Sequence, residues 1–221
     1  MENNCDYDIT SEKKLSIFLK KKKIDVIIHL AAQAGVRYSL INPTEFVQNN
    51  ILGFYNVINL AKKNDINKIF YASSSSVYGD SNNFPLKENQ IINPKNIYSL
   101  SKKNNEEMAE IFSKQFNIKF IGLRFFTIYG EWGRPDMFLM KYLISSYNKT
   151  RKFYLNNFGN HTRDFTYIID ACEIIEKLLI SKKKHLNHQI FNICSNNPIK
   201  LLDIISELNR LTNKKPNFGQ K

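Results

Sequence analysis

The sequence predicts an α/β fold built on a parallel sheet, because short apolar runs alternate with longer segments of helical periodicity. The runs at 24–30, 68–72 and 119–124 are rich in β-branched and aromatic residues, as buried strands are. Apolar residues at helical spacing fill 44–63 and 99–116 between them. This alternation is typical of a parallel sheet with flanking helices.

The ends of these elements also carry signals. Pro43 precedes the first helical segment, and we expect Thr44 to cap it. On the second helical segment we expect one apolar side, formed by Met108, Ala109, Ile111, Phe112 and Phe116. Later in the chain, the patterns predict helices at about 137–149, 168–181 and 201–211 and a short strand at 189–194.

Composition limits the class of protein. With 221 residues, 43% of them hydrophobic, the chain can form one sizeable core and a small second lobe. No apolar run is long enough to span a bilayer and no signal-peptide pattern is visible, so we expect a cytoplasmic protein that is not inserted in a membrane. Cys5, Cys172 and Cys194 are scattered, which predicts neither a disulfide framework nor a metal site.

The formal net charge of +12 has two interpretations. It can indicate a nucleic-acid or anionic-membrane partner, or it can reflect a lysine-rich composition with solvated faces. No basic motif interleaved with aromatic residues is present. We therefore favour the second interpretation and expect no nucleic-acid partner.

Three segments follow the predicted strands at the carboxyl ends, where parallel sheets bind ligands. They are Ala31-Ala32-Gln33, the four serines Ser73–Ser76, and Phe125-Phe126-Thr127. These three segments are therefore expected at one edge of the sheet.

Tyr98 and Lys102 form a Tyr-x-x-x-Lys pair that lies on one face of a helix. A tyrosine has a pKa of about 10, too high for a base at neutral pH, but a neighbouring ammonium lowers it. Such a pair can take the proton of a hydroxyl group that is being oxidised, and a serine hydroxyl such as that of Ser74 can hydrogen-bond the same oxygen. The pair alone is a weak signal, because any helix can contain it by chance.

Six stretches together are more specific, and in order and spacing they resemble the NAD-dependent epimerase/dehydratase family, within the extended short-chain dehydrogenases/reductases. They are His29-Leu30-Ala31-Ala32, Asn49-Asn50-x-x-Gly53, Ser73–Gly79, Tyr98-x-x-x-Lys102, Leu123–Gly130 and Arg163-Asp164-Phe165-x-Tyr167. The resemblance covers roughly residues 8–210. It implies a Rossmann-like fold, NAD as cofactor and a nucleotide sugar as substrate.

The resemblance also implies roles for individual residues. The catalytic residues would be Ser74, Tyr98 as the base and Lys102, which bonds the nicotinamide ribose and tunes Tyr98. The cofactor-binding residues would be Asp8, Ile9, Leu30, Ala31, Ala32, Asn50, Tyr98 and Lys102. Arg163 would hold the substrate diphosphate, a role suited to a guanidinium. The structural alternative for Arg163 is a surface ion pair with Asp164.

The stretches at 31–39 and 129–137 closely resemble UDP-glucuronate 4-epimerases, which implies conversion of UDP-glucuronate to UDP-galacturonate by transient oxidation at C4. Ser75 and Ser76 stand where the dehydratases have Asp-Glu, which disfavours dehydration. With Thr127 they could donate to the C5 carboxylate, and Arg134 could pair with it or act as a loop cation. The alternatives are another NAD-dependent nucleotide-sugar epimerase or dehydratase, a catalytically impaired fragment of one, or a basic binding protein.

The chain departs from the family pattern in one respect, since it has no Gly-x-x-Gly-x-x-Gly turn. Its first residues resemble a point about sixty residues into the fold, so we expect a fragment that lacks this turn and the C-terminal end. We expect residues 1–130 to form a partial NAD-binding domain and 131–221 mostly a substrate-binding lobe. By analogy we expect a homodimer through the helices near 44–63 and 99–116.

Overall fold

The computed structural model describes residues 8–19, 23–81, 83–148, 150–181 and 186–219. The chain forms two compact units. The first runs to Phe125 and is completed by the segment that ends at Asn192, and the second contains Phe126–Ser181 and Ile193–Lys221. Cys5 lies outside the described residues.

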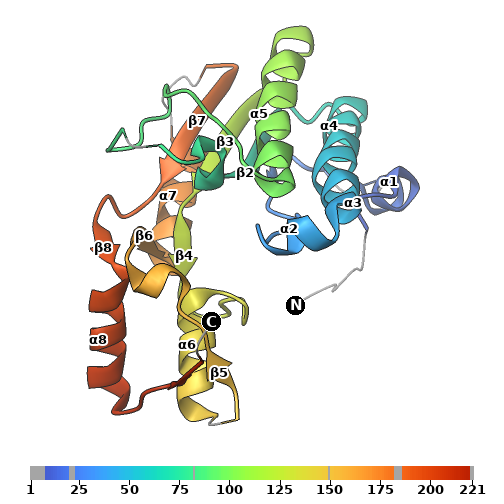
Figure 1. Cartoon of the computed structure of the whole chain (residues 1–221). Coiled ribbons are helices and arrows are strands. Elements are labelled where there is room, and N and C mark those ends of the chain that lie inside the picture. The colour runs from blue at the N-terminus through green and yellow to red at the C-terminus, as the bar shows by residue number, and fades with distance from the viewer. Residues whose placement is uncertain (1–7, 20–22, 82, 149, 182–185, 220–221) are drawn as a thin grey trace. The chain divides into compact units, whose positions relative to one another are not determined.

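The first unit contains a four-stranded sheet in the order β1-β2-β3-β7 (Figure 1). Its strands are β1 (Ile27–His29), β2 (Lys68–Ser74), β3 (Lys119–Phe125) and β7 (His188–Ile193). The first three are parallel, as the sequence predicts, with Ile28 opposite Phe70 and Phe70 opposite Ile121. Strand β2 continues to Ser74, because the first two serines still pair with β3.

Strand β1 corrects the expectation of a buried strand over 24–30. It has only three residues, and Ile28 is 43% exposed while its neighbour His29 is buried. Successive side chains of a strand point to opposite faces. Described residues therefore cover one face of β1 at this position and leave the other open.

Helices α4 (Gly53–Lys63) and α5 (Ile97–Gln115) lie side by side (Figure 1), with the Tyr55 and Phe112 rings 6.3 Å apart. The predicted helix at 44–63 is an unbroken helical segment made of α3 (Pro43–Phe46), a π-helical turn η1 (Val47–Leu52) and α4. Thr44 does not cap it. Asn42 is the N-cap and Pro43 the first helical residue, a position that suits the fixed φ of proline. Short helices α1 (Glu12–Leu19) and α2 (Tyr38–Ile41) complete the unit.

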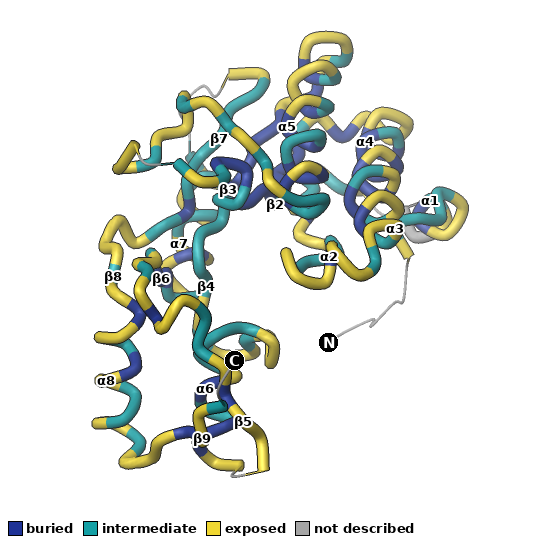
Figure 2. The backbone as a smooth tube through the Cα atoms, in the orientation of Figure 1, coloured by how far each residue is buried: buried dark blue, intermediate teal, exposed yellow. Residues whose placement is uncertain are grey.

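The core of the first unit lies between the sheet and these helices (Figure 2). Phe54, Ile58, Tyr71 and Phe120 are fully buried in it. On α5, Ala109 is buried as predicted, but Ile111 is 53% exposed and does not belong to the buried side. Ile111 lies two positions from Ala109, about 200° away around the helix, so the two cannot share a face.

The second unit has a three-stranded sheet in the order β4-β6-β8 and a two-stranded one of β5 and β9. Its helices α6, α7 and α8 match the three predicted helical segments within two residues at each end. A small core joins Tyr142, Phe153 and Ile205. The bounds are β4 (Thr127–Tyr129), α6 (Phe138–Tyr147), β5 (Lys152–Phe153), η3 (Asn156–Gly159), β6 (Thr162–Tyr167), α7 (Ile168–Ile180), β8 (Pro198–Lys200), α8 (Leu201–Thr212) and β9 (Asn217–Phe218).

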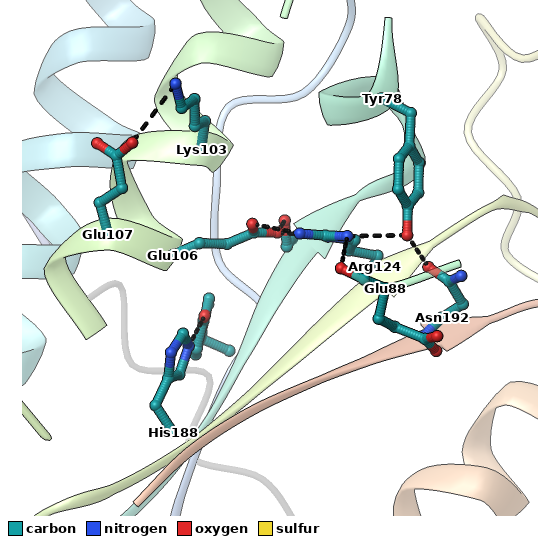
Figure 3. A network of polar contacts seen from close by, with 10 residues as sticks. Tyr78, Glu88, Lys103, Glu106, Glu107, Arg124, His188 and Asn192 are labelled. Atoms are coloured by element: carbon teal, nitrogen blue, oxygen red, sulfur yellow. Dashed lines mark hydrogen bonds and ion pairs between the residues drawn. The ribbon is translucent and has the colours of Figure 1, made fainter. Parts of the chain in front are cut away.

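A buried ion pair between Glu106 of α5 and Arg124 of β3 crosses the first unit (Figure 3). Arg124 Nε and Nη2 donate to the two carboxylate oxygens of Glu106 at 2.9 and 2.8 Å. Burial alone would lower the pKa of Arg124, but the hydrogen bonds and charge of Glu106 raise it above its ordinary value. The guanidinium also donates to the Tyr78 hydroxyl and to the Glu88 carbonyl.

We expect this ion pair to behave as a unit when it is removed. Glu106→Leu or Arg124→Leu leaves the partner charge buried without compensation and should cost about 3–5 kcal/mol in the free energy of unfolding. The double variant should cost less than the sum of the two, because neither charge remains. Urea unfolding of the three variants measures this, and strictly additive losses would contradict it.

Candidate active site

Three serine hydroxyls gather where β2 ends. Ser74 is the last residue of β2, and Ser75 begins a short 3₁₀ helix, η2 (Ser75–Tyr78). The Ser74 Oγ accepts hydrogen bonds from the backbone N–H of Ser76 at 3.2 Å and from its Oγ at 3.0 Å. We call Ser74–Ser76 the serine turn.

Gly79 closes the serine turn in a conformation that requires glycine. Its φ is +63°, and a Cβ at this position would collide with the backbone oxygen of Asn93. The Asn93 N–H in turn donates to the Val77 carbonyl at 2.9 Å. The segment before Asn96 is thereby held against the serine turn.

Helix α5 presents Tyr98 in its first turn. Asn96 caps the helix in a capping box: its side chain accepts from the Ser99 N–H at 2.9 Å, while the Ser99 hydroxyl accepts from the Asn96 N–H. The half-buried Tyr98 ring meets Phe46 of α3 edge-on, with ring centres 6.1 Å apart. The cap fixes the residue at which α5 begins, and the contact with Phe46 fixes the position of the Tyr98 ring.

Lys102, one turn further along, is only 3% exposed. Its Nζ donates to the carbonyl of Ala72 in β2 at 2.8 Å, which ties α5 to the strand that ends in Ser74. Burial lowers the pKa of Lys102 to about 8. Within the described ranges, no carboxylate forms an ion pair with this ammonium, so only the bond to the Ala72 carbonyl offsets the cost of burying it.

His29 lies at the end of β1, close enough to feel the charge of Lys102. Burial first, and then the Lys102 ammonium, lower the pKa of His29 to about 4, so this side chain is neutral at pH 7. Its ring stacks on Phe54 with centres 5.5 Å apart. From the sequence, His29 had no predicted role beyond its place in a motif. The signal was a histidine at the last position of an apolar strand.

Asn50 fixes the loop that follows β1. Its side-chain oxygen accepts from the Gln33 N–H at 2.8 Å, and its amide donates to the Gln33 carbonyl at 3.0 Å and to Ser101 Oγ at 2.9 Å. All three bonds are internal, and the side chain is 1% exposed. Asn50 therefore shapes the Leu30–Gln33 loop, and its effect on a ligand would pass through the backbone of that loop.

Asp8 and Ile9 are anchored to α4. The Asp8 carboxylate accepts from the N–H and hydroxyl of Thr10, and these bonds lower its pKa. Asn56 donates to the carbonyls of Ile9 and Thr10 at 3.0 and 3.1 Å. The Ile9 side chain lies directly over Gly53, where a Cβ would clash with it. The Asp-Ile motif and the Asn49-Asn50-x-x-Gly53 motif therefore meet where Ile9 packs on Gly53.

The remaining predicted site residues belong to the second unit. Thr127 begins β4 and is partly buried. Arg134 forms a two-pronged ion pair with Asp136, at 2.9 Å from Nε and 2.5 Å from Nη2. The Arg163 guanidinium is exposed and donates to the Thr162 carbonyl at 3.1 Å.

The alternative of an Arg163–Asp164 ion pair does not occur in the structure as described. The Asp164 carboxylate accepts instead from the backbone of Ser195 at 2.9 Å and of Asn197 at 3.1 Å. It also accepts from the hydroxyls of Ser195 and Thr166. These bonds leave the Arg163 guanidinium without a carboxylate among the described residues.

None of the helices among the described residues is long and apolar enough to cross a membrane. No group of three or more His, Cys, Asp or Glu side chains in the same part of the chain is placed to hold a metal ion.

Comparison with known proteins identifies the class. Residues 2–194 match the NAD dependent epimerase/dehydratase family, and the chain belongs to this family.

Among its relatives, the uncharacterized protein MJ1055 of Methanocaldococcus jannaschii is 43% identical, over 89% of this chain and 60% of its own length. A probable UDP-glucuronate 4-epimerase of Rhizobium meliloti is 35% identical, over 84% of this chain and 59% of its own. The structure of a Bacillus cereus UDP-glucuronic acid 4-epimerase with UDP-glucuronic acid and NAD superposes with a TM-score of 0.84 at 32% identity, over 99% of this chain and 66% of that one. The chain thus spans about 60% of the length of these two curated relatives.

Replacing Lys102 should stabilise the chain at pH 7. Its pKa is about 8 when folded but about 10.4 when unfolded, so the unfolded state binds more protons between these values. The buried Lys102 charge therefore lowers the free energy of unfolding by its full amount below pH 8. This loss disappears as the pH rises past about 10. After the lost bond to Ala72 is subtracted, Lys102→Met should gain about 2 kcal/mol at pH 7.

Urea unfolding at pH 7 and pH 10 tests this. The half-exposed neighbour Lys103, which pairs with Glu107 on the surface, is the control. Lys103→Met should change the free energy of unfolding by less than about 1 kcal/mol. A Lys102→Met chain that is less stable than the parent at pH 7 would contradict the assigned burial cost.

Loss of the Asn50 side chain should free the Leu30–Gln33 loop. Asn50→Ala removes the acceptor of the Gln33 N–H, so hydrogen exchange at that amide should accelerate by at least about tenfold. Asn56→Ala removes an equally internal amide that does not touch the loop, and should leave exchange at Gln33 unchanged. Equal acceleration in both variants would show that Asn50 does not hold the loop.

Proposed function

We propose that the protein containing this chain is an NAD-dependent nucleotide-sugar 4-epimerase, which interconverts UDP-glucuronate and UDP-galacturonate. The observation that carries the proposal is the buried Lys102 ammonium, which follows Tyr98 by one turn of α5 and donates to Ala72 of the strand that ends in Ser74. The relatives named as UDP-glucuronate 4-epimerases support the choice of sugar.

The side chains around Lys102 fit a nicotinamide nucleotide. An ammonium has three N–H donors, and Lys102 uses one of them on Ala72. The other two are suited to the vicinal hydroxyls of a ribose. The loop at Ala31 and Ala32 has only methyl side chains, which leaves its backbone open to a flat ligand, and Asn50 holds that loop in place.

In the proposed reaction, NAD held beside Lys102 would supply reversible hydride transfer at C4 of the sugar. Tyr98 removes the proton of the C4 hydroxyl, and the Lys102 charge favours its phenolate. Ser74 donates a hydrogen bond to the same oxygen. After the 4-keto sugar turns over, the hydride would return to the other face of C4, and Tyr98 returns the proton to the C4 oxygen. The C4–H and O–H bonds that break in the first half of the reaction form again in the second half, so NAD would be neither consumed nor left reduced.

We propose further residues for the diphosphate and the carboxylate of the substrate. Because Arg163 has no carboxylate partner among the described residues, its guanidinium suits a diphosphate, which would stay bound while the sugar turns. Ser75 and Thr127 supply hydroxyl donors for the C5 carboxylate, and Ser76 would join them by giving up its bond to Ser74 Oγ. Arg134 would have to exchange Asp136 for the substrate, so we assign it a charge contribution that is secondary to these hydroxyls.

Exposed apolar residues of η1, α4 and α5 support a homodimer through the segments 44–63 and 99–116, which we propose by analogy. They are Leu52, Tyr55, Leu100 and Ile111. We propose a cytoplasmic location on the same footing, since nucleotide sugars are soluble substrates.

The proposal is tested with a substrate panel on the protein extended to the length of its relatives. UDP-glucuronate and UDP-galacturonate should interconvert, and UDP-glucose should react poorly. Tyr98→Phe should lower kcat by at least about 100-fold with little change in KM, because it removes the base. Turnover of UDP-glucose but not of the uronates would favour another nucleotide-sugar epimerase, and loss of water from the sugar would favour a dehydratase.

Arg134→Ala separates the two interpretations of that residue. If Arg134 helps to bind the carboxylate, the variant should lose about tenfold in kcat/KM for UDP-glucuronate and nothing for a neutral sugar nucleotide. An equal loss for both substrates would show that Arg134 only stabilises its loop.

A further inference from the structure

One buried ion pair holds the serine turn on both sides. Before the turn, Ser73 Oγ donates to Glu106 Oε1 at 2.5 Å. After it, the Tyr78 hydroxyl accepts from Arg124 Nη1 at 2.8 Å. Glu106 and Arg124 are bound to each other by two further bonds, and none of the four side chains is more than 4% exposed. We call these four residues the clamp (Figure 3 labels Tyr78, Glu106 and Arg124).

The clamp also ties the serine turn to the helix of Tyr98 and Lys102. Glu106 follows Lys102 by four residues, as Lys102 follows Tyr98, so the three side chains lie along one face of α5. Lys102 binds the carbonyl of Ala72, and Glu106 binds the hydroxyl of the next residue, Ser73. Helix α5 therefore contacts β2 at two consecutive residues, directly before Ser74.

Neighbouring elements leave the clamp little freedom. Ser73 and Arg124 are direct partners in the β2–β3 register, and the Arg124 guanidinium lies 4.8 Å from the centre of the Tyr78 ring. The Tyr78 hydroxyl donates to the side-chain oxygen of Asn192 in β7 at 2.7 Å. Burial raises the pKa of Tyr78, so it remains a neutral donor over the physiological range. Charge-assisted bonds of this kind are short and directional.

We infer that the clamp is a positioning device for the proposed reaction: it sets where the hydroxyls of Ser74–Ser76 lie relative to Tyr98. The inference rests on the proposed function, in which Ser74 and Tyr98 must reach the same C4 oxygen. A displacement of about 1 Å in such a geometry can cost about 100-fold in rate. The clamp residues act through the turn and have no assigned contact with substrate.

The test releases each side of the turn separately in the full-length protein. Ser73→Ala removes the bond to Glu106, and Tyr78→Phe removes the bond to Arg124, while both leave the ion pair itself intact. Each should lower kcat for UDP-glucuronate by about 10-fold or more and leave KM within about twofold. Hydrogen exchange of the backbone amides at 75–79 should rise by about tenfold in each variant.

Tyr142→Phe is the matched control. Tyr142 is also fully buried, and its hydroxyl also donates to an asparagine oxygen, that of Asn209 at 2.6 Å, but it lies in the core of the second unit. The control should lose a similar amount of thermal stability and keep its kcat and its exchange at 75–79. If Tyr78→Phe and Ser73→Ala match the control in both readouts, the inference is overturned.

The two proposals can fail separately. If the unmodified protein turns over none of the nucleotide sugars, the proposed function fails, and exchange at 75–79 still decides the clamp. Unchanged exchange at 75–79 in Ser73→Ala and Tyr78→Phe then overturns the clamp. Faster exchange in these two variants but not in Tyr142→Phe supports it. If the unmodified protein is active and the clamp variants keep its kcat, only the positioning inference falls.

Discussion

The first unit depends on the buried pair of Glu106 and Arg124. Each charge would be costly to bury alone, and the pair is tolerated because every strong donor and acceptor finds a partner. Glu106 accepts three hydrogen bonds, and Arg124 donates four. Through these bonds one helix, two strands and the turn after β2 share a single arrangement. A small shift in any of them would leave a buried charge unpaired.

Lys102, on the same helix as Glu106, differs in having no oppositely charged partner among the described residues. Its charge is buried without a carboxylate partner, and its lowered pKa records the cost. A group held this way destabilises the folded chain at neutral pH and is of use only if a ligand needs it. This is why the buried lysine indicates function more strongly than the Tyr-x-x-x-Lys spacing, which a surface helix could also show.

The relation between the two sites is physical. Glu106 lies one turn beyond Lys102 on α5, and its carboxylate binds Arg124 and Ser73. The negative charge of Glu106 is therefore already neutralised by the Arg124 guanidinium. Helix α5 thereby carries the Glu106 carboxylate one turn from the Lys102 ammonium without forming an ion pair with it. The ion pair stabilises the scaffold, and the lysine remains available for chemistry.

The sequence determined the class of fold, the parallel strands and the main helices, because hydrophobic periodicity reports which face of each element is buried. It also determined the family, through motifs such as Ser73–Gly79 and Tyr98-x-x-x-Lys102. Short strands such as β5 and β8 escaped it, since two or three residues carry no period. So did the π-helical turn η1, whose residues continue the apolar pattern of the helix around them.

Only the tertiary structure decided how the site residues are used. In sequence Asn50 was expected to bind the cofactor, and the structure shows that its amide bonds to Gln33 and Ser101. Arg134 was expected near a substrate carboxylate, yet it holds Asp136. No signal paired Glu106 with Arg124, because a carboxylate on a helix and an arginine in a strand are ordinary until folding brings them within 2.8 Å. Long-range pairing of polar groups has no period along the chain, and this is why it had to be seen in three dimensions.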